Sequence, residues 1–494
     1  MAKNIDLLLI NPGNRKTTHG VLKDKFSGIE PPVLLGLIAA FARENGFSVE
    51  IIDADAEELS PEKIAERVKS IQPILVGIVV LGANPSASST PKMPATRDIL
   101  NILKKEKLGV KTVMCGIHPS ALPEQTLHQE NIDFVSKGES FYTIVNLLKA
   151  LKTSNSSELQ DIKGLWYIDN GKLIANGWGK LVENLDELPF VAWDLLPMEK
   201  YRAHNWHCFG NINQRGHYTS IYTSMGCPFK CNYCNIHALY NGEPRLRLRS
   251  VKNIINEIDY LVLKYSIKNL KILDELFVFH KKRAHEICDL LIERDYKLNI
   301  WAYARIDTVE EELLTKLKKA GVNWISFGIE TGNEGIRKEA LKNGFNKDLI
   351  IRAIKMTKKA GIYVMGNFMF GFSSDNLETM QETLNLAKKL NCEYVNFYTT
   401  MAYPGSSLYE EMLQNGIALP QDWIKYSQFG YETEPLPTKY LSSKDVLYFR
   451  DNAFTFYLSD EHYLQTIKEK FGIDTVKHIK NMLKHKLRRK IFES

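Results

Sequence analysis

The sequence predicts an α/β protein in which a doubly wound parallel sheet is followed by a partial (β/α)6 barrel and a mainly helical region. Two observations carry this prediction. Short apolar segments alternate with amphipathic segments in two separate stretches, and the last stretch has helical spacing without strand-like runs. A length of 494 residues accommodates several domains, which we place at residues 1–152, 153–217, 218–407 and 408–494.

The first 152 residues alternate between strand-like and helix-like segments. Aliphatic runs predict strands at Asp6–Asn11, Val49–Asp53, Ile74–Val80, Val110–Cys115 and Phe134–Lys137. Amphipathic spacing predicts helices at Pro32–Asn45, Pro61–Ile71, Pro94–Leu108 and Phe141–Leu151. Such a sheet binds ligands at the carboxyl ends of its strands. The loops expected there are Asn11–Arg15, Leu81–Met93, Gly116–Pro123 and Gly138–Ser140.

Residues 153–217 form a predicted linker, in which the turn at Asp169–Gly171 (DNG) predicts a β-hairpin. Strand–helix alternation then resumes, with strands predicted at Tyr218–Thr223, Leu270–Leu273, Leu298–Tyr303, Trp324–Phe327, Tyr363–Phe370 and Tyr394–Thr399. Six such repeats predict part of a closed β/α barrel. The helical region that begins at residue 408 is expected to help close a substrate pocket.

Three of the seven cysteines lie within eight residues, in the segment Met225–Asn235 (MGCPFKCNYCN). The spacing is Cys227-x3-Cys231-x2-Cys234, directly after the first predicted barrel strand. A structural zinc site takes four ligands, usually as two pairs, and the sequence has no second pair. Three thiolates can instead hold a [4Fe–4S] cluster in which one iron has no protein ligand.

This spacing, with the aromatic Tyr233 before the third cysteine, resembles the radical S-adenosylmethionine (SAM) superfamily. The resemblance implies that SAM binds the free iron through its amino and carboxylate groups. It also implies that one electron, from a donor such as a reduced flavodoxin or ferredoxin, cleaves SAM to methionine and a 5′-deoxyadenosyl radical. That radical abstracts hydrogen from an unactivated carbon.

Residues after the second and third barrel strands match the family in order. Asp274 and Glu275 lie in a segment (LDELF) that resembles the one holding the methionyl amino group of SAM. Arg305 (WAYARID) resembles the arginine that neutralises the methionyl carboxylate or a neighbouring acid.

Two later segments extend the match. Glu330 (FGIETG) stands where the family commonly places a polar contact to the nucleoside of SAM. Asn367 lies in Met365–Gly371 (MGNFMFG), which fits the strand against the adenine. These two residues complete the expected SAM-binding set, together with Tyr233 and the residues of the earlier strands.

A doubly wound domain ahead of such a barrel resembles the cobalamin-binding class of the superfamily, whose first domain is Rossmann-like. The residues expected to bind cobalamin follow the strands of the first domain: Asn11, Pro12, Asn84, Ser86, Ser88, Gly116, His118, Gly138 and Glu139. The D-x-H-x-x-G motif, whose histidine ligates cobalt, does not occur in the sequence. The resemblance therefore implies base-off cobalamin without a histidine ligand, with the loop Leu81–Met93 at its lower face.

The expected activity is methylation of an unactivated carbon of a small-molecule, lipid or peptide substrate. Members of the family that cyclise or rearrange substrates without methyl transfer are the main alternative, and a non-catalytic iron–sulfur protein is another. RNA methylthiotransferases need three cysteines in the first domain, which has only Cys115. A dinucleotide-binding domain is disfavoured because no G-x-G-x-x-G follows the first strand.

Composition and charge limit the remaining possibilities. No apolar run approaches the roughly 20 residues of a membrane span, and the N-terminus lacks a signal peptide, so a cytoplasmic location is expected. Residues 476–494 carry seven basic and one acidic side chain, which account for the whole net charge of +6, and no nucleic-acid partner is expected. Residues 476–492 predict a basic amphipathic helix, which either contacts the inner membrane surface or docks on the body with its basic face in solvent.

Overall fold

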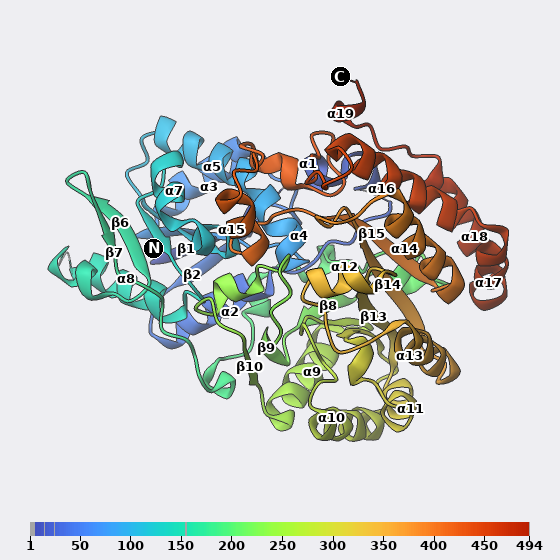
Figure 1. Ribbon diagram of the computed structural model, residues 1–494. Coiled ribbons are helices and arrows are strands. Elements are labelled where there is room, and N and C mark those ends of the chain that lie inside the picture. The colour runs from blue at the N-terminus through green and yellow to red at the C-terminus, as the bar shows by residue number, and fades with distance from the viewer. Residues whose placement is uncertain (1–4, 14, 24, 154–155, 494) are drawn as a thin grey trace.

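The computed structural model describes residues 5–13, 15–23, 25–153 and 156–493. Two β-sheets lie beside each other, and a group of C-terminal helices packs across them (Figure 1). The first sheet comes from the N-terminal part of the chain and the second from the middle. The predicted order of a doubly wound sheet, a partial barrel and a helical region is confirmed.

The first sheet has the strand order β2-β1-β3-β4-β5-β6-β7, and its first five strands are parallel. These five are β1 (Leu7–Asn11), β2 (Val49–Asp53), β3 (Leu75–Val80), β4 (Lys111–Gly116) and β5 (Phe134–Ser136). Every residue of β1 and β3 is buried, as expected for parallel strands covered on both faces. The covering helices are α2 (Val33–Glu44), α3 (Pro61–Ile71), α5 (Met93–Lys105), α7 (Pro123–Gln129) and α8 (Phe141–Thr153).

The segment Leu81–Met93, expected as a loop, is mostly helical. It contains α4 (Pro85–Ser89) and a 3₁₀ turn (Thr90–Lys92) that runs into α5. Asn84 caps α4, because its side-chain oxygen accepts a hydrogen bond from Ala87 N at 3.4 Å, and Pro85 occupies the first helical position. Figure 1 shows α4 at the centre of the molecule, between the two sheets.

The predicted hairpin is present as β6 (Leu165–Asp169) and β7 (Lys172–Ala175). Its turn residues Asn170 and Gly171 both have positive φ, which suits a tight hairpin turn. The hairpin is not a separate linker element, since β6 pairs antiparallel with β5. The first sheet therefore extends to Ala175, beyond the expected boundary at residue 152.

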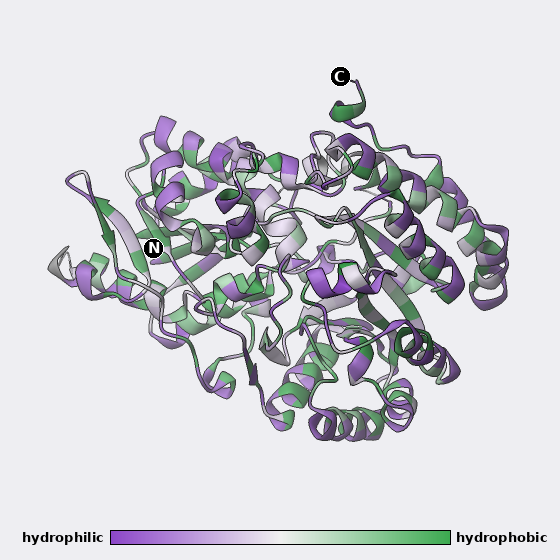
Figure 2. Cartoon of the chain, in the orientation of Figure 1, coloured by the Kyte–Doolittle hydropathy of each residue, from purple (hydrophilic) through white to green (hydrophobic). Residues whose placement is uncertain are grey.

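The second sheet is an open barrel of six parallel strands in sequential order. These strands are β8 (Tyr218–Ile221), β11 (Asn269–Ile272), β12 (Asn299–Ala304), β13 (Val322–Glu330), β14 (Tyr363–Phe370) and β15 (Tyr394–Thr399). The outer helices are α9 (Val251–Tyr265), α10 (Lys281–Arg294), α11 (Glu311–Lys319), α13 (Lys347–Lys359) and α14 (Leu377–Leu390), and a short helix α12 (Glu334–Glu339) follows β13. These outer helices alternate hydrophilic and hydrophobic residues (Figure 2), as amphipathic helices do.

One insertion follows the first barrel strand. It is a two-stranded antiparallel hairpin of β9 (Ser224–Cys227) and β10 (Arg245–Leu248). The cysteine motif begins at the end of β9, so this hairpin positions the first cysteine.

The C-terminal region consists mainly of helices: α15 (Ser407–Gln414), α16 (Ser443–Leu458), α17 (Glu461–Phe471), α18 (Ile473–Leu483) and α19 (Lys490–Glu493). The continuous basic helix expected over 476–492 is wrong, because α18 ends at Leu483 and residues 484–489 are not helical. Val476, Ile479 and Met482 are buried against the body.

Arg489 also turns inward rather than contributing to a basic surface. It is 1% exposed and forms an ion pair with Asp451 at 2.9 Å. Its guanidinium donates to the carbonyl oxygen of Gly430 at 2.8 Å. The C-terminal segment is therefore docked on the protein, which is the second of the two expected alternatives, although it is not one continuous helix. No helix among the described residues is long and apolar enough to cross a bilayer.

Candidate active site

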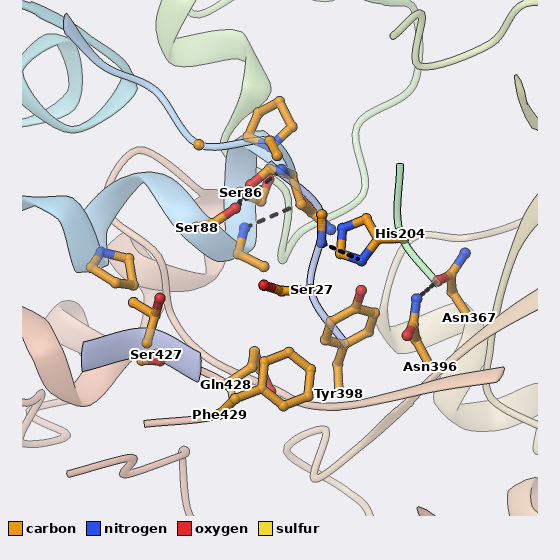
Figure 3. A pocket seen from close by; sticks show the side chains of 18 of the residues that line it. Ser27, Ser86, Ser88, His204, Asn367, Asn396, Tyr398, Ser427, Gln428 and Phe429 are labelled. Atoms are coloured by element: carbon orange, nitrogen blue, oxygen red, sulfur yellow. Dashed lines mark hydrogen bonds between the residues drawn. The ribbon is translucent and has the colours of Figure 1, made fainter. Parts of the chain in front are cut away.

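A cavity of about 1080 Å³ lies where the first sheet, the barrel and the C-terminal region meet. Asn84 and Ser86 line it from the first domain, Cys227 and Asn367 from the barrel, and Phe429 from the C-terminal region. Figure 3 shows Ser86 and Ser88 on one side of this pocket, with Asn367, Asn396 and Tyr398 on another. The carboxyl ends of strands from both sheets thus face one shared space.

All three clustered cysteines line the cavity. Cys227 ends β9, and Cys231 and Cys234 lie in the loop that follows. Gly226, with φ +96°, must be glycine, since a Cβ would lie 2.2 Å from the carbonyl oxygen of Arg245 on the paired strand. Ser86 Oγ of α4 is 3.6 Å from Cys234 Sγ, so the first domain contacts the cysteine loop directly.

The thiols suit a multi-iron centre. Burial raises the pKa of Cys227 and of Cys234 to about 12, so a bound metal centre is needed to hold them as thiolates. In the described part of the chain, no three His, Cys, Asp or Glu side chains converge closely enough to hold a single metal ion. An iron–sulfur cluster makes a different demand, because each thiolate binds a different iron.

A polar group at the carboxyl end of β13 lines the cavity together with the cysteines. Glu330 has φ +64°, and its carboxylate accepts a hydrogen bond from Lys342 Nζ at 2.7 Å. Lys342 Nζ also lies 3.4 Å from the hydroxyl of Tyr233. Gly328 leaves room for this pair, since a Cβ there would lie 2.5 Å from the Glu330 carboxylate. Lys342 was missed by the sequence analysis because it lies in a loop outside any recognisable motif.

Arg305 also lines the cavity, is 5% exposed and donates a hydrogen bond to the backbone oxygen of Asn343, the residue after Lys342. Its guanidinium lies over the ring of Phe229, 4.1 Å from the centroid, and forms an ion pair with Asp307 at 2.8 Å. These contacts fix the side chain, and a fixed guanidinium at the cavity wall can bind a carboxylate.

The two adjacent carboxylates after β11 have different roles. Asp274 does not line the cavity, contrary to expectation. It is buried and accepts hydrogen bonds from Thr223 N at 2.6 Å and from Ser224 Oγ at 2.6 Å, which fixes the start of β9. Glu275 faces the cavity, and burial together with the charge of Asp274 raises its pKa to about 7.

The raised pKa of Glu275 predicts a pH dependence of stability. A carboxyl whose pKa is higher in the folded than in the unfolded state stabilises the fold at low pH. This contribution is lost as the pH rises through about 7. We expect the stability of the cofactor-free wild type, relative to that of Glu275→Gln, to fall as the pH rises from about 5 to about 7. Unfolding midpoints of both proteins across this range check the prediction, and an equal pH dependence would contradict it.

Asn367 lies in the barrel interior, as its expected role requires. Its amide donates to Ser326 Oγ at 2.8 Å and its oxygen accepts from Asn396 at 3.1 Å (Figure 3). The amide is therefore held in one orientation by neighbouring strands. Asn396 was not identified from the sequence.

The first domain supplies a second polar wall. Asn11 lines the cavity and accepts a hydrogen bond from Lys92 Nζ at 2.6 Å, and Lys92 also donates to Pro12 O at 3.1 Å. Pro12 itself does not line the cavity, whereas Asn84, Ser86 and Ser88 do. Ser88 Oγ donates to Asn84 O at 2.7 Å, which closes the first turn of α4. Lys92 was another residue that the sequence analysis missed.

Besides Pro12, four more of the residues expected to bind cobalamin do not line the cavity. Gly116 has φ +113°, and a Cβ there would lie 2.2 Å from Val80 O, so packing between strands explains the glycine. Gly138, also with positive φ, donates from its backbone N to Ser120 Oγ at 2.9 Å. Neither glycine lines the cavity.

His118 and Glu139 are structural. His118 packs against Trp423 with ring centroids 4.5 Å apart, and burial lowers its pKa to about 3. Glu139 is 2% exposed and forms an ion pair with Arg247 of β10, so it ties the first domain to the barrel insertion. In this structure Trp423 and Arg247 occupy the space beside the two side chains, and neither side chain lines the cavity.

Two family models match the chain. Residues 221–387 match the radical SAM superfamily, and residues 20–148 match the B12-binding domain. An uncharacterized methyltransferase of Pyrococcus horikoshii is 32% identical over 484 residues, which cover 98% of this chain and 99% of that protein. The chain belongs to the cobalamin-binding radical S-adenosylmethionine enzyme family.

Other relatives of this cobalamin-dependent radical enzyme carry out different reactions. The anaerobic magnesium-protoporphyrin IX monomethyl ester cyclase of Rubrivivax gelatinosus is 25% identical, over 78% of this chain and 67% of that one. The cytidylyl-2-hydroxyethylphosphonate methyltransferase of Streptomyces wedmorensis is 24% identical, over 91% of each chain.

Solved structures share the fold. The radical SAM methyltransferase TsrM of Kitasatospora setae, solved with cobalamin and a [4Fe–4S] cluster, has a TM-score of 0.66 at 17% identity and covers 85% of this chain and 76% of that one. The cobalamin-dependent radical enzyme OxsB has a TM-score of 0.63 at 21% identity, covering 92% and 61%. In this enzyme, therefore, the B12-binding and radical SAM folds face each other across the cavity described above.

Proposed function

We propose that this enzyme methylates an unactivated carbon of an organic substrate, a small molecule, lipid or peptide, with SAM and cobalamin as cofactors. The supporting observation is that the three cysteines and the start of α4 share one cavity. Ser86 contacts Cys234 directly, so no layer of protein separates the radical SAM part from the B12-binding part at this point.

The cavity residues fit a [4Fe–4S] cluster and SAM. Cys227, Cys231 and Cys234 would hold three irons and leave the fourth open for SAM. When bound, these groups supply electron transfer, SAM cleavage and, with cobalamin, a methyl carrier. An electron donor such as a reduced flavodoxin or ferredoxin is part of the proposal.

The side chains that line the barrel would orient SAM. Arg305 would bind its carboxylate and Glu275 its amino group. Glu330 and Asn367 would contact the nucleoside, with Tyr233 beside the third cysteine. Lys342 holds the Glu330 carboxylate in place.

Cobalamin would lie against α4, with Asn84 and Ser88 beneath it. Among the described side chains of the first domain, no histidine lines the cavity. We therefore propose the base-off form without a histidine ligand. Two histidines from other regions line the cavity: His204, which lies 4.0 Å from Glu30, and His485 of the C-terminal segment.

The absence of a histidine ligand predicts a spectroscopic result. In the cobalt(II) state, the EPR spectrum is expected to lack nitrogen superhyperfine splitting, because neither imidazole nor the cofactor's own base is bound. His118→Gln is expected to give the same spectrum, since the His118 ring is packed on Trp423. Nitrogen splitting that disappears in His118→Gln or in His204→Gln would contradict the prediction.

The relatives named as cyclases support a second candidate, a radical cyclase that transfers no methyl group. Anaerobically reconstituted protein with SAM deuterated at its methyl group distinguishes the two. Methyl transfer predicts S-adenosylhomocysteine and label in the cobalamin fraction. Formation of 5′-deoxyadenosine with neither product would reject the methyltransferase and favour the cyclase.

A further inference from the structure

Arg450 stands at the edge of the cavity, on the face of α16 that packs against β15. It is 2% exposed and lines the cavity. Its Nε donates to Phe397 O at 2.7 Å, and Nη1 forms an ion pair with Asp451 at 2.6 Å. The guanidinium carbon lies 4.7 Å from the centroid of the Phe429 ring. The side chain is thus held rigidly on three sides.

The remaining nitrogen of this guanidinium has no partner. Within the described residues, Nη2 of Arg450 is buried and lacks a hydrogen-bond acceptor. A buried, unpaired donor on a charged group costs more than a neutral one. Because this donor stands at a cavity wall, a group bound in the cavity is able to supply the acceptor.

Charged side chains of both signs surround Arg450. Asp451 is shared by two guanidinium groups, since Arg489 also pairs with it at 2.9 Å. Lys444 and Lys486 line the same cavity from α16 and the C-terminal segment. Asp445 also lines it, but its carboxylate accepts from Ser442 N at 3.0 Å as a helix cap.

This wall lies close to the proposed cofactor site. Burial raises the pKa of Tyr398 to about 12. A hydrogen bond with Asn84 and the positive charge of Arg450 both oppose this rise. Figure 3 shows Tyr398 with Gln428 and Phe429 among the residues that line the pocket. A group held by Arg450 would therefore share the cavity with Tyr398 and with Asn84, the residue that caps α4.

We propose that Arg450, supported by Phe429, binds an oxyanion of the organic substrate, a phosphate, phosphonate or carboxylate group. The two free hydrogens of Nη2 point to an anionic acceptor. This inference rests on the proposed function only in that the substrate enters this cavity.

The test measures anion binding without turnover. Isothermal titration of the cobalamin-loaded protein uses inorganic phosphate as the probe. Arg450→Gln is expected to weaken binding about tenfold, the loss of a charge-assisted hydrogen bond, and Arg450→Lys less. Arg488→Gln removes one charge from an exposed position of the same region and is expected to change nothing. Equal binding by wild type and a folded Arg450→Gln overturns the proposal.

Two further arms address folding and ligand source. If Arg450→Gln does not fold, wild-type crystals soaked in phosphate test the proposal instead. The proposal requires phosphate density within hydrogen-bond distance of Arg450 Nη2, and phosphate density only elsewhere overturns it. Phosphate should bind equally to protein loaded with cobalamin or with cobinamide, which lacks the nucleotide phosphate. Binding to the cobinamide form alone would assign Arg450 to the cofactor's phosphate and overturn the substrate assignment. Because no step needs SAM cleavage, failure here is separable from failure of the proposed reaction.

Discussion

Replacing Cys231 with alanine is expected to reduce SAM cleavage to the background rate and to lower the iron content of the reconstituted protein. The loop holds only three thiols, so the loss of one leaves too few ligands for the proposed cluster. Formation of 5′-deoxyadenosine under dithionite, with iron counted in the same sample, checks the prediction.

Cys288→Ala is the matched control. Cys288 lies on α10, is fully buried and does not line the cavity. This substitution is expected to leave both iron content and SAM cleavage unchanged in the folded protein. Wild-type cleavage in Cys231→Ala, or an equal loss in both variants, would contradict the assignment of the cysteines.

Replacing Glu139 with glutamine is expected to destabilise the protein by about 3–5 kcal/mol, because it leaves Arg247 as an unpaired buried charge. Glu139 and Arg247 have side-chain exposures of 2% and 6%. The Glu139 carboxylate also accepts a hydrogen bond from Val182 N at 3.1 Å. Chemical and thermal unfolding of the cofactor-free protein measures the effect.

A neighbouring pair provides the control for this prediction. Arg245 lies on the same strand β10 and pairs with Glu183 at 2.8 Å, where Glu183 is 71% exposed. Glu183→Gln is expected to cost less than about 1 kcal/mol. If the two substitutions destabilise equally, the ion pair between Glu139 and Arg247 is not the tie between the first domain and the barrel insertion.

Most of the fold follows from local patterns. The parallel strands of both sheets and the first-domain helices α2, α3, α5 and α8 were predicted to within a few residues, because apolar spacing reports which face of an element is buried. The elements β9, β10, α7 and α12 were not predicted. The prediction of a loop at Leu81–Met93 was wrong. Its Ser and Pro residues suggested a loop, although Asn84 and Pro85 are typical of a helix start. The prediction of a continuous basic helix was wrong because Arg489 is buried by contacts with Asp451 and Gly430, which are distant from it in the sequence.

The site was predictable where chemistry is local in sequence. The spacing of the cysteines places all three at the cavity, and Arg305 and Glu330 follow from their strand ends. The sequence could not show which of Asp274 and Glu275 lines the cavity, because this depends on which carboxylate faces Thr223.

Other assignments needed the tertiary structure. His118 and Glu139 stand at strand ends as ligand-binding residues do, but Trp423 and Arg247 occupy the space beside them. Lys342, Lys92 and Arg450 lie outside recognisable motifs, and only folding brings them to the cavity.

The central claim is that one cavity holds both metal cofactors. EPR of protein loaded with cobalamin and cluster, reduced so that cobalt(II) and the cluster are both paramagnetic, tests it most directly. The contact between Ser86 and Cys234 predicts magnetic interaction, seen as broadening or splitting and faster relaxation than in protein carrying either cofactor alone. A spectrum equal to the sum of the two separate spectra, with unchanged relaxation, would contradict the shared cavity.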